Sequence, residues 1–326
     1  MIPLSILDLS PINLGSNAAH SFRNTLDLAR HAEQYGYRRF WLAEHHGMPG
    51  IASAATAVLI GHVASGTSAI RVGAGGIMLP NHSPLVIAEQ FGTLESLYPG
   101  RIDLGLGRAP GSDSATSQAL RRNLASDPNE FPRDVLELAD YFSESPRQAV
   151  RAVPGMGLNV PLWILGSSSF GAQVAAALGL PYAFASHFAP AQMMEAIALY
   201  RSQFRPSRQL RQPYVMLGFN VFAADTLAEA TFRATSMQQA FINLRTGRPS
   251  QLPPPVEGYV ERIGPHERAI LDQVLSCSSV GTPEAVRSDL RSFAARTGAD
   301  ELMITSQIFD HGARLHSFEI AAQSLG

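Results

Sequence analysis

The stretch FWLAEHHGMPG, residues 40–50, begins as an apolar run and ends in a carboxylate and two imidazoles. Residues 40–43 do not alternate with polar side chains, which is typical of a strand covered on both faces. Glu44, His45 and His46 follow before the chain turns on glycine and proline. This pattern predicts a buried parallel strand over residues 38–44, whose end carries polar, chemically active groups.

The same kind of apolar run recurs along the chain and alternates with amphipathic helical segments. The further strand segments are 2–10, 70–79, 101–107, 162–166, 182–186, 214–224 and 301–309, and the helical segments are 21–36, 53–67, 84–100, 131–143, 170–180, 190–204 and 283–297. Such alternation predicts parallel strands joined by right-handed crossovers. Eight strands in 326 residues favour a single (β/α)8 TIM-barrel domain, residues 1–326, over a doubly wound sheet.

Two segments are too long for ordinary barrel connections. Residues 108–130 form a polar stretch after the fourth strand, and an insertion of about 225–280 follows the seventh. The second contains two helical stretches interrupted by 245–258, where three consecutive prolines cannot continue a helix. Long insertions in compact domains often cover binding sites, so we expect both to lie over the functional end of the barrel.

Composition excludes several classes of protein. The formal net charge is −2 and no long basic run occurs, which argues against a nucleic-acid partner. The single cysteine, Cys277, precludes an intramolecular disulfide and a cysteine-based zinc site, and we expect it to be a packing residue in a helix-like stretch. The N-terminal segment is interpreted as a strand rather than a signal peptide, and no apolar run is long enough to span a membrane. We therefore expect a cytoplasmic protein without a membrane partner.

The polar residues at the end of the second strand are candidates for acid–base chemistry. A histidine near its ordinary pKa can give or take a proton at working pH, and His45 is the candidate. The alternative is that one histidine binds a carbonyl and the other is solvated. A metal site is not expected, because neighbouring side chains of an extended segment, such as His45 and His46, point in opposite directions.

Glycines mark the end of the third strand. Gly75 and Gly76 leave it with little side-chain bulk, which suits the close approach of a ligand or a second backbone. A tight corner of the barrel would explain the same residues. The sequence leaves both interpretations open.

Two features could hold an anion. Arg108 follows the fourth strand among small residues, where its guanidinium could bind a phosphate, or alternatively form a surface salt bridge. Ser167, Ser168 and Ser169 follow the fifth strand and precede a helix, whose free N–H groups suit an anion. Ordinary capping of the helix by one serine is the alternative.

Four segments together resemble the bacterial luciferase-like family of flavin-dependent monooxygenases: FWLAEHHG, VGAGGIMLPNHSP, YPGRIDLGLGRAPG and LGSSSFGAQVAAALGLPYAFASHF. The resemblance covers nearly the whole chain and implies a (β/α)8 barrel, commonly a homodimer. It implies His45 as the catalytic histidine and a cis peptide between Gly75 and Gly76 under the flavin ring. The residues implied at the flavin phosphate are Arg108 and Ser167, with Ser168, Phe170 and Gly171 nearby.

The resemblance also implies an activity. The expected function is oxygenation of a small organic substrate with O2 and reduced FMN (FMNH2), supplied by a separate flavin reductase. A hydride-transferring enzyme that uses the deazaflavin F420 and a non-catalytic flavin-binding protein are the alternatives. Luciferase itself has glutamate where this chain has Gly166 and cysteine where it has Gly107, so we expect room near the ring at Gly107 and no light emission.

Overall fold

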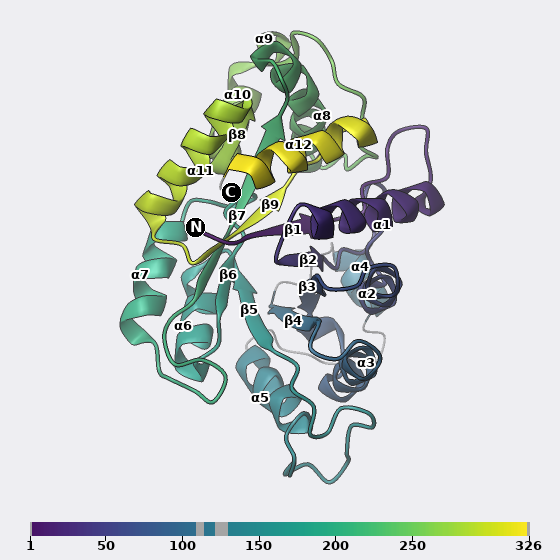
Figure 1. Ribbon diagram of the computed structural model, residues 1–326, viewed down its shortest axis with the longest axis vertical. Coiled ribbons are helices and arrows are strands. Elements are labelled where there is room, and N and C mark those ends of the chain that lie inside the picture. Colours follow the sequence, from purple (N-terminus) through teal and green to yellow (C-terminus); the bar gives the residue numbers. More distant parts are fainter. Residues whose placement is uncertain (1, 109–113, 121–129, 325–326) are drawn as a thin grey trace.

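The computed structural model describes residues 2–108, 114–120 and 130–324. Eight parallel strands run in the order β6-β5-β4-β3-β2-β1-β9-β7, and pairing of β6 with β7 closes them into a barrel (Figure 1). This closure confirms the predicted TIM barrel and excludes the doubly wound sheet. The barrel strands are β1 (Leu4–Asp8), β2 (Arg39–Leu42), β3 (Arg71–Met78), β4 (Ile102–Gly107), β5 (Leu162–Gly166), β6 (Tyr182–Phe184), β7 (Val215–Ala223) and β9 (Glu301–Thr305).

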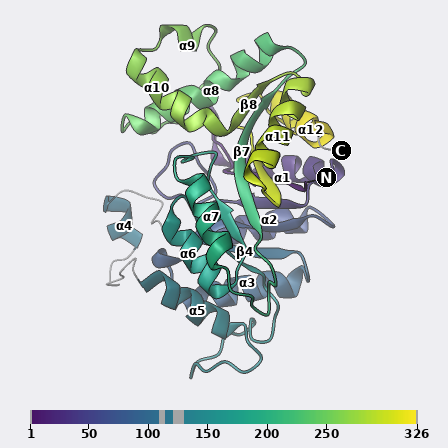
Figure 2. The same ribbon diagram turned by 90° about the vertical axis from the view of Figure 1, so that its left-hand side faces the viewer.

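Helices surround the barrel, and Figures 1 and 2 show them distributed around the central strands. The longer ones are α1 (Ala18–Gln34), α2 (Thr56–Ser65), α3 (Pro84–Leu97), α5 (Phe131–Tyr141), α6 (Ser169–Leu178), α7 (Met193–Gln203), α8 (Leu227–Arg245), α10 (Pro265–Val274), α11 (Pro283–Thr297) and α12 (His311–Ser324). Short helices are α4 (Ser114–Leu120), α9 (Tyr259–Arg262), and the 3-10 turns Leu79–Asn81 and Leu275–Cys277. Among the described residues, no helix combines the length and apolarity needed to cross a membrane.

The structure differs from the sequence expectation at one added strand. Residues Ser278–Gly281, predicted as part of the insertion, form β8, which pairs in parallel with the second half of β7 outside the closed barrel. β7 is nine residues long and extends past its barrel neighbours, so its free edge can accept this extra strand. Cys277, immediately before β8, is buried as expected but ends a 3-10 turn.

Apolar side chains form separate clusters outside and inside the barrel. The outer cluster packs strand residues such as Ile6 and Phe40 against the helices. The inner cluster fills the barrel and contains Trp41, Trp163 and Met303. Successive strand residues point to opposite faces of the barrel, and the two clusters bury both faces. This explains why the strand segments are continuous apolar runs.

Both predicted insertions reach the ends at which the strands leave the barrel. The loop after α8 hydrogen-bonds through Leu252 to Ile12 and Leu14, just beyond β1. Its Ser250 carbonyl lies so close to Gly50, beyond β2, that a side chain there would clash. Of the earlier insertion, residues 109–113 and 121–129 lie outside the described residues, but α4 contacts the β2 exit: a Cβ at Gly47 would lie 2.7 Å from Thr116 Oγ1.

Candidate active site

His45 lies at the exit of β2, close to residues that face the barrel interior. Arg39, Trp41 and Ala43 point inward, and His45 follows two positions after Ala43. His45 is partly buried, and its charge is near enough to influence the pKa of His187. The structure thus brings the predicted acid–base residue to the functional end of the barrel.

His187, which follows β6, is a histidine of this site that sequence reasoning did not single out as functional. Its ring packs against Gly218 of β7, and its Nδ1 atom is buried without a hydrogen-bond partner among the described residues. Burial, followed by the nearby charge of His45, lowers the pKa of His187 to about 4. The ring is therefore neutral at neutral pH.

Gly75 and Gly76 lie in β3, where the Gly76 carbonyl accepts a hydrogen bond from the amide of Glu44, and the peptide bond between them is cis. A Cβ at Gly75 would lie 3.0 Å from both Leu7 and Trp41, inside the barrel. A Cβ at Gly76 would lie 2.7 Å from the Gly105 carbonyl oxygen. Close approach of other protein groups accounts for Gly76, whereas Gly75 is the partly exposed member of the pair.

The two candidate anion-binding features meet at neighbouring strand exits. β4 and β5 pair with Gly107 opposite Leu165, which brings Arg108 to the turn before α6. The guanidinium carbon of Arg108 lies 4.2 Å from the centre of the Phe170 ring. Among the described residues, Arg108 forms no hydrogen bond or ion pair with a carboxylate, so the surface salt bridge considered from the sequence is not seen there.

The serine turn also has groups available for a ligand. Ser168 occupies the N-cap position of α6, but its hydroxyl makes no capping hydrogen bond, so ordinary capping does not explain it. Ser167 is exposed, while Ser169 hydrogen-bonds Glu195 at 3.4 Å. Gly171 is buried, and a Cβ there would lie 3.3 Å from Tyr182 and 3.4 Å from Gly166 Cα, so this glycine permits close packing of α6 on β5. Arginine, hydroxyls and a helix N-terminus together suit a phosphate.

One expectation about free space needs correction. The absence of a side chain at Gly107 does not leave that position empty, because a Cβ there would lie 2.9 Å from the Met78 sulfur. Met78 comes from the adjacent strand β3 and can move, since its side chain is flexible. The room expected at Gly107 is therefore partly occupied by Met78.

Glu44, next to His45, connects the exits of β2 and β3. Its Oε1 accepts hydrogen bonds from His46 Nε2 at 2.7 Å and His82 Nε2 at 2.9 Å, and its Oε2 accepts one from the Met78 amide at 3.0 Å. Burial acts to raise the pKa of Glu44, but the hydrogen bond and charge of His82, with the other donors, outweigh it and the pKa is lowered. The described residues contain no group of three or more histidine, cysteine, aspartate or glutamate side chains placed to hold a metal ion.

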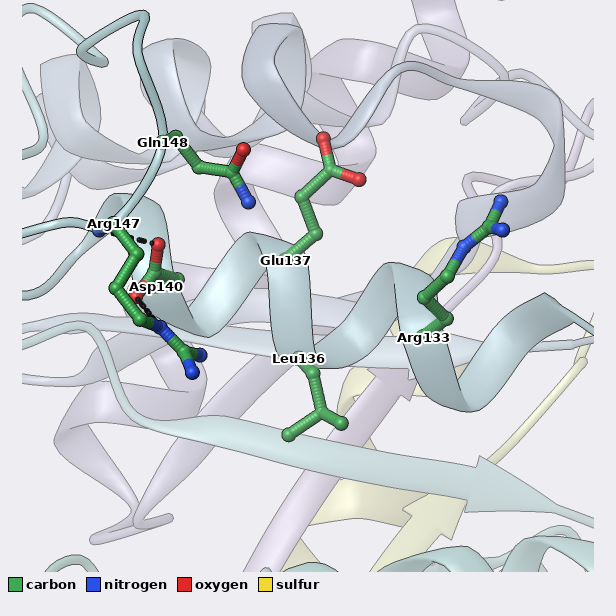
Figure 3. Close-up of a pocket in the computed structure, with 6 residues that line it drawn as sticks. All are labelled: Arg133, Leu136, Glu137, Asp140, Arg147 and Gln148. Carbon is green, nitrogen blue, oxygen red and sulfur yellow. Dashed lines mark hydrogen bonds and ion pairs between the residues drawn. The ribbon is translucent and has the colours of Figure 1, made fainter.

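A hollow on the outer surface is separate from these residues. It measures about 240 Å³ and is lined by α5 and the loop after it, including Arg133, Asp140 and Arg147 (Figure 3). The Asp140 carboxylate already accepts hydrogen bonds from the amide and the guanidinium of Arg147. None of the predicted site residues lines this hollow.

Histidines, glycines and the corner formed by Arg108 and the serine turn lie at the strand exits of a parallel barrel, where TIM-barrel enzymes carry their active sites. Residues 2–301 match the model of the luciferase-like monooxygenase family. The chain is 58% identical over 321 residues, 98% of its length and 96% of the relative's, to a luciferase-like monooxygenase of Escherichia coli (strain K12). The chain belongs to the luciferase-like monooxygenase family.

Solved structures show the same fold. The crystal structure of apo-MsnO8 is 36% identical, covers 100% of this chain and 98% of its own, and superimposes with a TM-score of 0.94. The oxygenating component of 3,6-diketocamphane monooxygenase from Pseudomonas putida, solved in complex with FMN, has a TM-score of 0.73 at 18% identity, covering 99% and 98% of the two chains. The second likeness shows the fold alone.

Proposed function

We propose that this protein is a flavin-dependent monooxygenase that uses reduced FMN and O2 to oxygenate a small organic substrate. The observation that carries the proposal is the meeting of Arg108 with the turn at Ser167, Ser168 and Phe170. The Arg108 guanidinium has no carboxylate partner among the described residues, and the serine hydroxyls at the start of α6 make no capping hydrogen bond. This combination fits a phosphate monoester. FMN ends in such a group.

Each predicted residue has a role in this proposal. Arg108, Ser167 and Ser168 hold the phosphate, and Phe170 supports the guanidinium by stacking. Gly75 and Gly76 form the part of the barrel exit against which the ring lies, and Gly171 lets α6 approach closely.

Reduced FMN supplies the electrons for oxygen activation, while the protein positions the reactants and excludes water. His45 moves a proton at the substrate, and His187 beside it stays neutral. The loop 245–258 and α4 cover the strand exits and keep water from the reacting groups.

An F420-dependent oxidoreductase is the second candidate. An F420-dependent secondary alcohol dehydrogenase shares the fold, with a TM-score of 0.70 at 13% identity. Its cofactor would occupy the same corner, and hydride transfer would replace reaction with oxygen. A flavin-binding protein without turnover is the third possibility.

The test begins with fluorescence titrations of the purified protein with FMN and with F420. Saturable binding of FMN, followed by uptake of O2 with reduced FMN and incorporation of one oxygen atom into a substrate from a panel of thioethers, ketones and aldehydes, is expected. Absence of saturable FMN binding would contradict the proposal. Binding of F420 in its place, with no O2 uptake, would establish the second candidate, and bound FMN without coupled oxygen consumption the third.

We also propose that the protein is a homodimer that receives reduced FMN from a separate reductase. Adjacent helices α2 and α3 expose stripes without charged side chains, including Val58 at 76% and Leu97 at 63% exposure. A contiguous apolar patch marks an interaction surface, and we propose that these two helices supply such a patch between subunits. Val58→Lys should therefore shift the protein toward monomer in sedimentation velocity while leaving its circular dichroism unchanged; an unchanged sedimentation coefficient would argue against this interface.

A further inference from the structure

Glu44 connects separate segments of the site through its hydrogen bonds. Its carboxylate, only 1% exposed, receives three hydrogen bonds, from His46, His82 and the amide of Met78. Its own amide donates to the carbonyl of Gly76 at 3.1 Å. One residue therefore joins the exit of β2, the Gly75–Gly76 segment and the 3-10 turn that follows β3.

Burying an ionised carboxylate destabilises the fold unless its oxygens accept hydrogen bonds. Here both oxygens accept hydrogen bonds, and the lowered pKa shows that the ionised form is favoured. Hydrogen bonds to an ionised acceptor are stronger and more directional than those between neutral groups. Glu44 thus fixes the positions of its three donors, which lie on two different chain segments.

The regular pairing of β2 with β3 does not require this carboxylate. The two strands are already in register from Arg39 opposite Arg71 to Leu42 opposite Ala74. Glu44 acts beyond the last of these pairs, next to the part of β3 where the pairing of β3 with β4 shifts register, between Gly75 and Ile77. Its hydrogen bonds hold together the segment that carries His45 and the segment that carries Gly75 and Gly76.

We propose that Glu44 is a positioning residue for the ring-binding half of the site, holding the backbone of His45 in fixed relation to Gly75 and Gly76. This inference rests on the proposed binding of a flavin. It separates two halves of the site: Arg108 and the serine turn act on the phosphate, whereas Glu44 acts on the surface against which the ring lies. The two halves can be distinguished with FMN and with riboflavin, which lacks the phosphate.

The experiment compares Glu44→Gln with Glu95→Gln. Glu95 is a matched control because it is also buried, at 8% exposure, and also accepts a backbone hydrogen bond, from Gly100 at 2.7 Å, but lies on α3 away from the strand exits. In Glu44→Gln the amide oxygen can still accept from Met78, while the amide NH2 must face the two imidazole donors. We expect affinity for FMN and for riboflavin to fall by the same factor, about tenfold, the effect of losing one strong hydrogen bond.

Affinities are measured by quenching of flavin fluorescence at a temperature well below the melting point of every variant, so that a loss of stability alone does not change them. Glu95→Gln should bind both flavins like the wild-type protein. Equal affinity of Glu44→Gln and wild type for both flavins would overturn the inference, as would a loss confined to FMN. If the wild-type protein binds neither flavin, the proposed function fails instead.

A second variant covers the case in which Glu44→Gln does not fold. His82→Phe keeps a ring at a partly exposed position and removes one of the donors to Glu44. This variant should lower the affinity for both flavins about threefold, since His46 and the Met78 amide still donate to Glu44. Unchanged affinity for both flavins in His82→Phe would then overturn the inference.

Discussion

Arg39 and Arg108, at opposite ends of the barrel, use their charge in different ways. At the N-terminal end of the strands, Arg39 donates to Asp103 at 2.7 Å and to Glu301 at 3.0 Å, and these acids are fully buried. Further donors complete the network: Arg71, Trp41, Tyr214 and Ser5. At the C-terminal end, Arg108 and two serine hydroxyls have no such partners among the described residues.

The Arg39 network stabilises the fold, whereas Arg108 and the serine turn are available for the proposed ligand. Burial acts to lower the pKa of Arg39, but Asp103 and Glu301 outweigh burial and raise it, so the cation is firmly held. Each charged side chain in this network is paired with another protein group, so the network acts on the stability of the barrel. Arg108 and the serine turn keep hydrogen-bonding groups that the described residues do not use, as the proposed phosphate site requires.

The largest expected effect comes from breaking the N-terminal network. Arg39→Met leaves two buried carboxylates without their shared cation, and should lower the free energy of unfolding by about 3–5 kcal/mol. Urea unfolding measures the loss. Arg133→Met removes an exposed pair with Glu130 and should cost less than about 1 kcal/mol. Similar losses in both variants would contradict the contrast between buried and exposed pairs.

The next effect concerns ligand affinity at the other end. Arg108→Met should lower the affinity for FMN about 10- to 100-fold, because charge-assisted hydrogen bonds to the phosphate are lost. The free energy of unfolding measured in urea should change little. Riboflavin has no phosphate, so its affinity should stay within about twofold of the wild-type value. Parallel fluorescence titrations give both affinities. An equal loss of affinity for FMN and riboflavin would contradict the assignment of Arg108 to the phosphate site.

The smallest effect is a pH dependence that arises from His187. An unfolded chain protonates this histidine near its ordinary pKa of about 6.5, whereas the folded protein protonates it only near 4. Between these values the unfolded state binds more protons, so stability decreases as pH falls through this window. A shift of about 2.5 pH units at about 1.4 kcal/mol per unit would give about 3.5 kcal/mol, and because the ring is partly exposed we expect a smaller contribution of about 2 kcal/mol.

His187→Phe tests this dependence because phenylalanine retains a ring against Gly218 but cannot titrate. Its stability should fall less steeply between pH 6.5 and 4 than that of the wild-type protein. His316→Phe is the control: hydrogen bonding to Asp225 raises the pKa of His316, so its stabilising effect is present at low pH and is lost as pH rises. Identical slopes for wild type and His187→Phe would refute the assignment.

Much of the fold follows from local patterns. The segments 38–44, 101–107 and 162–166 became β2, β4 and β5 with boundaries shifted by two residues or fewer. β8 was not predicted, because a four-residue strand has little periodicity and exists only through its pairing with β7. That Arg108 and the serine turn lie together was implied by the family resemblance, and the pairing of β4 with β5 brings them side by side.

The order of the residues alone determined the barrel and the strand exits at which polar groups collect, because periodicity and the ends of apolar runs are local properties. Only the tertiary structure decided which of those groups contact one another. His187 lies beside His45, Glu44 binds His82, and Arg39 joins Asp103 to Glu301. The residues in each set are separated by up to hundreds of positions along the chain. Closure of the barrel brings them together, and no pattern within one segment encodes that contact.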